Sequence, residues 1–232
     1  SWTIALDQQR VLGAHAQPNL LKILDPLPDE VFGDLYFELH EQKREVYVVT
    51  HVDERAWPEG VGAIRYGFSQ DKRAQFSDQS SFFSAYRDAV REYQLVRREL
   101  DGLMDALRER EGIALLEPVS AAQTQRWLTE LPQDLRSREA TLRATMEAFT
   151  ALRELRVGDV VAVPLFIPHA LQHGVRTVEF QTPVYERKIL SFAQKVLTQD
   201  HWDTDEALQL AHLQTPADEA FPQISNANGV VI

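Results

Sequence analysis

Hydrophobic and polar positions change their spacing twice along the chain, and this divides the sequence into three regions. Residues 18–68 contain the alternating stretch "YFELHEQKREVYVVTHV" and the shorter "GVGAIRYGF", which are typical of β-strands. Between residues 78 and 155 the apolar side chains recur every three or four positions, which indicates amphipathic helices. Residues 157–198 return to strand-like stretches such as "VGDVVAVPLF" and "RTVEFQT". This order favours one β-structure with a helical insertion, and two separate domains of an α+β chain are the alternative.

The longest predicted helix spans about seven turns. Its apolar positions are Phe82, Tyr86, Val90, Tyr93, Val96, Leu100, Leu103 and Leu107. Asp78 or a neighbouring serine can cap its start, and Gly112 ends it. A second helix is predicted from Ser120, and a third run of apolar residues continues to Leu155. The tail, residues 199–232, is polar, and we expect a surface extension there with a capped helix start at "HWDTDEAL".

Charge and cysteine content narrow the function classes. The formal net charge is −11, so neither nucleic acid nor an anionic membrane surface is expected as a partner. The chain has no cysteine, which excludes disulfides, thiolate metal sites and a cysteine nucleophile. No apolar run approaches the roughly 18 residues of a membrane span, and no signal peptide is recognisable. We therefore expect a cytoplasmic protein.

Three ionisable residues stand where an ordinary strand core would be apolar. Glu38 and His40 are two positions apart, so a strand would project them from one face, roughly 7 Å apart at the backbone. If residues 41–44 form a tight connection, Glu45 begins the return strand and faces the same way. Two carboxylates and an imidazole would be costly to bury unpaired, and a divalent cation would supply the missing opposite charge.

The expected fourth ligand is His169, in "GDVVAVPLFIPHALQHG". It lies five residues after Pro164, at the predicted start of a strand that follows a turn. His173 is an alternative, but Gly174 beside it indicates a turn. Carboxylate and imidazole ligands suit zinc, manganese, iron or nickel, and we expect zinc. The competing interpretation is a buried polar network or a solvated face without an ion.

These motifs resemble those of the cupin superfamily, and among cupins the type I phosphomannose isomerases. The spacing G-x5-P-x4-His up to His169 is similar to the second cupin metal motif, and Glu38-x-His40-x4-Glu45 is similar to a variant of the first. Lys43-x-Glu45, "PLFIPHAL" and "VEFQTPVYER" resemble further segments of the isomerases. The sequence departs from that family: Glu38 stands where the family has Gln, the connection to Lys43 is shorter, and the segment between Glu179 and Arg187 is slightly shorter. We also expect no room in these 232 residues for a second barrel.

The resemblance implies a mainly β fold, a cupin-type jelly-roll barrel formed by residues 1–76 and 157–232, with residues 77–156 as a helical insertion. It implies a metal ion held by Glu38, His40, Glu45 and His169, with Arg187, Glu179 and Lys43 as catalytic residues. The implied activity is aldose–ketose isomerisation of a sugar phosphate. The expected partners are a sugar or sugar phosphate and, in a homodimer, a second copy of the chain. The alternatives are another cupin metalloenzyme, an oxygenase or lyase, and a non-catalytic sugar-binding module.

Overall fold

The computed structural model describes residues 19–31, 33–114, 117, 119–193, 199 and 201–214, and its strands form two antiparallel sheets. The four-stranded sheet has the order β1-β8-β3-β6, and the five-stranded sheet has the order β5-β4-β7-β2-β9. The strands are β1 (Leu20–Leu24), β2 (Phe37–Leu39), β3 (Glu45–Val52), β4 (Gly62–Phe68), β5 (Thr150–Leu155), β6 (Val160–Val163), β7 (His169–Leu171), β8 (Val175–Gln181) and β9 (Lys188–Ser191).

The inner faces of the two sheets pack against each other. Tyr47 and Val49 of β3 share one buried apolar cluster with Ile64 of β4 and Leu171 of β7. Alternation along each strand produces this core, because successive side chains point to opposite faces. The predicted combination of β-strands and helices is confirmed, but the described residues form a mixed α and β structure rather than a mainly β one. Among the described residues, however, the strands pair as two separate sheets rather than as one closed barrel.

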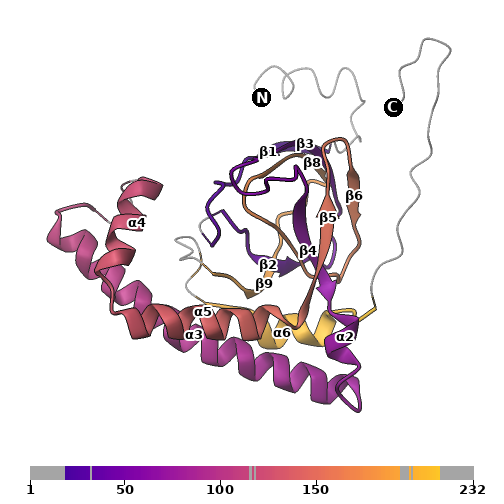
Figure 1. The fold of residues 1–232 in the computed structure, drawn as a ribbon. Coiled ribbons are helices and arrows are strands. Elements are labelled where there is room, and N and C mark those ends of the chain that lie inside the picture. Colours follow the sequence, from indigo (N-terminus) through magenta and orange to yellow (C-terminus); the bar gives the residue numbers. More distant parts are fainter. Residues whose placement is uncertain are drawn as a thin grey trace, which may run out of the picture.

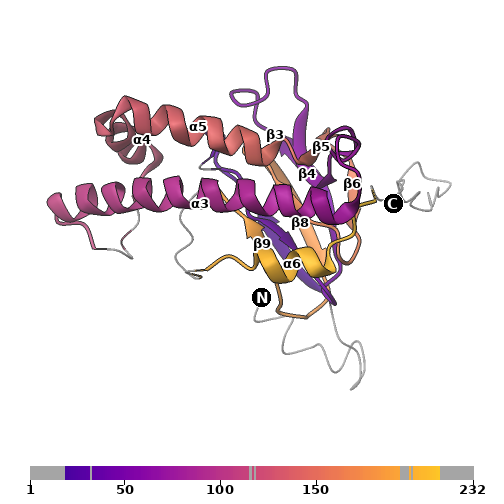
Figure 2. The same ribbon diagram turned by 90° about the horizontal axis from the view of Figure 1, so that it is seen from below.

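Helices cover the outer face of the five-stranded sheet, as Figures 1 and 2 show. The described helices are α2 (Gln70–Arg73), α3 (Gln79–Arg110), α4 (Ala121–Glu130), α5 (Gln133–Glu147) and α6 (Thr204–Leu210), of which α4 lies beyond the sheet and contacts α3. Phe82 and Tyr86 of α3 are fully buried in a cluster with Phe37 and Phe68 of the sheet. Both faces of this sheet are therefore apolar, which is expected of a sheet buried on both sides.

The helix predictions hold where the start and stop signals are clear. Asp78 caps α3 through a reciprocal capping box with Ser81, and Gly112 follows the helix at a φ of 71°. Ser120 caps α4, as expected. The described part of the tail also contains the predicted helix, α6, whereas residues 215–232 lie outside the described residues.

The third helical run was predicted too long. Helix α5 ends at Glu147, and Thr150–Leu155 form β5, which pairs with β4. The apolar residues Met146, Phe149, Leu152 and Leu155 recur every three positions, so the helical period continued past the true end of the helix. Leu152 is in fact 58% exposed, while Leu155 is fully buried. Pairing with β4 overrode the local pattern, because a strand satisfies these backbone groups equally well.

In the part of the chain that the structure describes, no helix is both long enough and apolar enough to span a bilayer.

Candidate metal centre

The four predicted ligands converge from three strands between the sheets. Glu38 lies on β2 directly opposite His169, the first residue of β7, and His40 follows β2. Glu38, His40 and His169 each offer a ligand atom within 4.8 Å of the others. The remaining residue, Glu45, places Oε1 3.5 Å from His40 Nε2 and Oε2 3.0 Å from His169 Nε2. Residues more than a hundred positions apart thus meet at one point.

Glu45 reaches this point by a different route from the predicted one. It does begin a strand, but β3 belongs to the four-stranded sheet, whereas β2 belongs to the other, so the two strands do not form a hairpin. The short connection between them crosses from one sheet to the other. Glu186 holds this crossing by accepting hydrogen bonds from the backbone N–H groups of Gln42 and Lys43. Thr182 Oγ1 accepts another from Arg44 N, at 3.0 Å.

The hydrogen bonds of His169 argue for a cation at this point. Its Nδ1 lies 3.1 Å from the Ile167 carbonyl oxygen, which can only accept, so Nδ1 carries a proton. In a neutral imidazole Nε2 then has a lone pair, yet it faces the Glu45 carboxylate at 3.0 Å. Two acceptors lie this close only when a proton or a metal ion stands between them. A hydrogen bond from Nδ1–H to a backbone carbonyl is also the usual way to orient a metal-binding histidine.

The electrostatics of the apo protein fit the same interpretation. Burial opposes charge on His169, but the hydrogen bond and the negative charge of Glu45 outweigh it and raise the pKa of this imidazole. Burial would raise the pKa of Glu45, but the hydrogen bond with His169 and the nearby imidazole of His40 hold it below its usual range. Burial lowers the pKa of His40, which is only 2% exposed. In the metal-free protein, a proton on His169 Nε2 therefore supplies the positive charge that a metal ion would supply between His169 and Glu45.

Unsatisfied buried atoms provide an independent test of the fit. Glu38 Oε2 and both ring nitrogens of His40 are buried without a hydrogen-bond partner. Such atoms are rare in folded proteins because each one loses its interactions with water. A divalent ion would satisfy them, and these oxygen and nitrogen donors suit zinc and other first-row metals. The residues present therefore fit the metal ion that the sequence motifs imply.

Two of the three predicted catalytic residues lie beside the centre. The Nζ atom of Lys43 is 2.6 Å from Glu45 Oε1, and this lysine is only 8% exposed. Glu179 lies on the inner face of β8, directly opposite Tyr47 of β3. Burial raises the pKa of Glu179, and the charge of Glu45 raises it further, while Lys22 opposes both effects.

The third, Arg187, immediately precedes β9, the strand that pairs with β2. Its guanidinium stacks over the ring of Tyr36, 5.3 Å from the ring centroid. It also lines a surface hollow of about 280 Å³ together with Tyr185 and Lys188. Tyr185 lies beyond β8, which ends at Gln181, and it is 96% exposed.

The alternative ligand, His173, belongs to another cluster. Its Nδ1 lies 2.7 Å from Asp34 Oδ1, and its ring stacks on Trp57. Gly174 next to it has a φ of 66°, which fits the predicted turn.

Sequence reasoning missed two residues of the site. Lys22 of β1 places Nζ 3.0 Å from Glu179 Oε1, and the hydroxyl of Tyr47 donates to Glu45 Oε2 at 2.8 Å. The position of Tyr47 was readable, because it lies two residues after Glu45 on the same face of a strand. The contact of Lys22 depends on the pairing of β1 with β8, for which the sequence contains no local signal.

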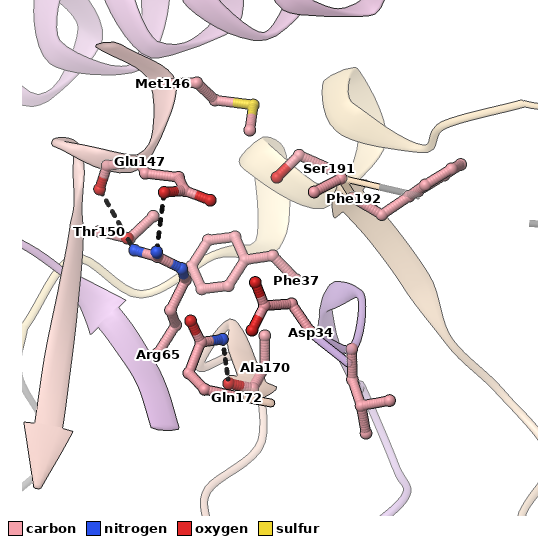
Figure 3. Close-up of a pocket in the computed structure, with 12 residues that line it drawn as sticks. Asp34, Phe37, Arg65, Met146, Glu147, Thr150, Ala170, Gln172, Ser191 and Phe192 are labelled. Carbon is pink, nitrogen blue, oxygen red and sulfur yellow. Dashed lines mark hydrogen bonds and ion pairs between the residues drawn. The ribbon is translucent and has the colours of Figure 1, made fainter. Parts of the chain in front are cut away.

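A second polar cavity lies between the five-stranded sheet and α5 (Figure 3). Its volume of about 20 Å³ leaves room for roughly one water. Arg65 reaches Glu147 at 2.9 Å and donates to Thr150 Oγ1 from the same guanidinium, and Asp34 points in from the opposite side. The ion pair between Arg65 of β4 and Glu147 of α5 connects the sheet to the helix beside this cavity.

Replacing Glu147 with Gln should change how stability depends on pH. Burial raises the pKa of Glu147, opposed by Arg65 and Arg143 and reinforced by the charges of Asp34 and Glu30. The folded state therefore binds this proton more tightly than the unfolded state does. Its contribution is complete below the unfolded pKa and disappears as the pH rises through the folded pKa. Urea denaturation should show wild type losing stability relative to Glu147→Gln as the pH rises above about 4.3, the ordinary pKa of a glutamate.

The matched control is Glu154→Gln, which removes the same charge from an exposed position. A stability of wild type relative to Glu147→Gln that stayed constant or increased with pH would contradict the expected effect.

Comparison with known proteins gives matches by structure alone. No family model matches the sequence, and no curated protein matches it either. The mannose 6-phosphate isomerase from Bacillus subtilis is similar in structure, with a TM-score of 0.52 and 13% identity over 97% of this chain. A mutant phosphomannose isomerase from Salmonella typhimurium gives a TM-score of 0.45 at 11% identity, covering 97% of this chain and 64% of its own. A zinc-bound mannose 6-phosphate isomerase gives 0.43 at 11% identity, covering 92% and 60%. This chain spans 55% of the Bacillus subtilis protein, and over that length it has the fold of a mannose 6-phosphate isomerase.

Proposed function

We propose that this protein is a metal-dependent aldose–ketose isomerase that acts on a sugar phosphate. The observation that carries the proposal is the meeting of two carboxylates and two imidazoles between the sheets, with His169 Nε2 facing Glu45 Oε2 at 3.0 Å. The proposed ligands are Glu38, His40, Glu45 and His169, and zinc is the proposed ion. We also propose that the two sheets correspond to the jelly roll of a cupin, with residues 77–156 as its insertion.

When bound, the ion would act as a Lewis acid toward the carbonyl and hydroxyl oxygens of the open-chain sugar. The proton transfer itself is assigned to Glu179. This carboxylate would take the proton from C2 of the aldose and return it to C1, while the hydroxyl proton passes from O2 to O1. Atoms and electrons balance within the sugar, so no oxidant or co-reactant is required. The raised pKa of Glu179 supports the role, because it brings the carboxyl closer to neutral working pH.

The cations around the site have separate proposed roles. Lys22 donates to Glu179 Oε1 and would hold this base in position. Lys43 would contact a hydroxyl or phosphate oxygen of the substrate in addition to its bond with Glu45. Arg187 is proposed to stabilise the negative charge that develops on the enediolate. For Arg187 this requires the guanidinium to leave the ring of Tyr36 when substrate binds.

The direct test is incubation with mannose 6-phosphate. Metal-free protein would be loaded separately with Zn²⁺, Mn²⁺, Fe²⁺ or Ni²⁺, and fructose 6-phosphate would be measured. Product with at least one ion, and none after chelation, is the expected result. A complete lack of product with every ion would overturn the isomerase proposal. Thermal stabilisation by the sugar phosphate without turnover would instead favour a binding module, and oxygen uptake by the iron-loaded form would favour an oxygenase.

A further inference from the structure

Tyr47 places a hydroxyl group in the apolar core between the sheets. It is 4% exposed, and its neighbours in the same buried cluster are mainly aliphatic. A buried phenol usually needs a hydrogen-bond partner, and the partner here is the carboxylate of Glu45 at 2.8 Å. A phenol is protonated at neutral pH and a carboxylate can only accept, so the Tyr47 hydroxyl is the donor in this bond.

The two oxygens of Glu45 have different sets of partners. Lys43 lies at Oε1, whereas Tyr47 and His169 lie at Oε2. Tyr47 lies two residues after Glu45 on β3, so strand alternation puts both on one face, and Lys43 reaches the same carboxylate from the connection that precedes the strand. The terminal torsion of a glutamate is soft, and a carboxylate without such partners turns easily about it. Donors on both oxygens remove this freedom.

We propose that Tyr47 is a positioning residue of the metal centre, whose hydroxyl fixes the rotation of the Glu45 carboxylate and so presents it to the ion. The inference rests on the metal-dependent function proposed above. Tyr47 does not coordinate the ion but sets the direction of a ligand that does. Loss of an outer-shell partner of this kind typically weakens metal binding by about 10–100-fold.

The test compares Tyr47→Phe with a matched variant, Tyr93→Phe. Tyr93 is also fully buried, and its hydroxyl also lies 2.9 Å from a glutamate carboxylate, Glu139, but in the helices α3 and α5. Both variants lose one buried phenol–carboxylate hydrogen bond, so they should lose similar stability. The zinc dissociation constant would be measured by competition with a chromophoric chelator, and the visible spectrum of the Co²⁺-loaded protein would report ligand geometry.

Tyr47→Phe should bind zinc about 10–100-fold more weakly than wild type and give a changed Co²⁺ spectrum, while Tyr93→Phe should match wild type in both. Equal zinc affinity in Tyr47→Phe and wild type would overturn the role of Tyr47 alone. A wild-type protein that takes up no divalent ion would instead overturn the proposed metal-dependent function. If Tyr47→Phe does not fold, a second measurement replaces it: zinc should still alter the tyrosine absorption of wild type and of Tyr93→Phe. An unchanged tyrosine absorption in both proteins would overturn the inference.

Discussion

Glu179→Gln should lower kcat by about 10²–10⁴-fold, which is the range for removing a general base. The amide keeps the size of the side chain and its place on the inner face of β8, but it cannot accept a proton from carbon. The ion should still bind, because Glu179 is not among the four proposed ligands. The measurement pairs the turnover of mannose 6-phosphate with the metal content of the purified variant.

The control for this change is Gln181→Glu, which restores a carboxylate two residues along the same inner face in the Glu179→Gln background. Turnover should not return, because the base must be at the position of Glu179. Full activity in Glu179→Gln alone would remove Glu179 from the mechanism and leave the metal centre as proposed.

His169→Ala should abolish uptake of the ion at micromolar concentration. Loss of a direct ligand is expected to exceed the roughly 100-fold upper range for an outer-shell partner. The substitution also removes the imidazole that faces Glu45 Oε2, so the apo protein should be less stable as well. Elemental analysis after dialysis and urea denaturation without metal would measure the two effects separately.

His173→Ala is the matched control, four residues further along the chain. It removes an imidazole that is paired with Asp34 and stacked on Trp57. It should lower stability but leave metal uptake unchanged. If His173→Ala lost the ion and His169→Ala kept it, the assignment of the fourth ligand would be wrong.

Spacing along single segments predicted much of this arrangement. The apolar period of three and four predicted α3, and Asp78 and Gly112 marked its ends. The spacing of Glu38 and His40 predicted that these two side chains would project together. These features depend on neighbours in sequence, and such neighbours have fixed geometry within a strand or a helix.

Features that depend on pairing between distant segments were not predictable in the same way. Glu45 was expected on a return strand beside β2, but the connection crosses to the other sheet. Lys22 meets Glu179 only because β1 pairs with β8 in one particular register. A shift of that register by one residue would turn Lys22 to the other face of the sheet. Leu152 and Leu155 continued a helical period that the pairing with β4 overrode.

The crossing from β2 to β3 gives a bound ion a mechanical role. Because Glu38, His40 and His169 come from one sheet and Glu45 from the other, a captured cation would act as a cross-link between the two layers. Any breathing motion that parts the layers would then have to break coordination bonds first. Amide hydrogen exchange at the beginnings of β3 and β7 should therefore be slower in the metal-loaded protein than in the metal-free protein.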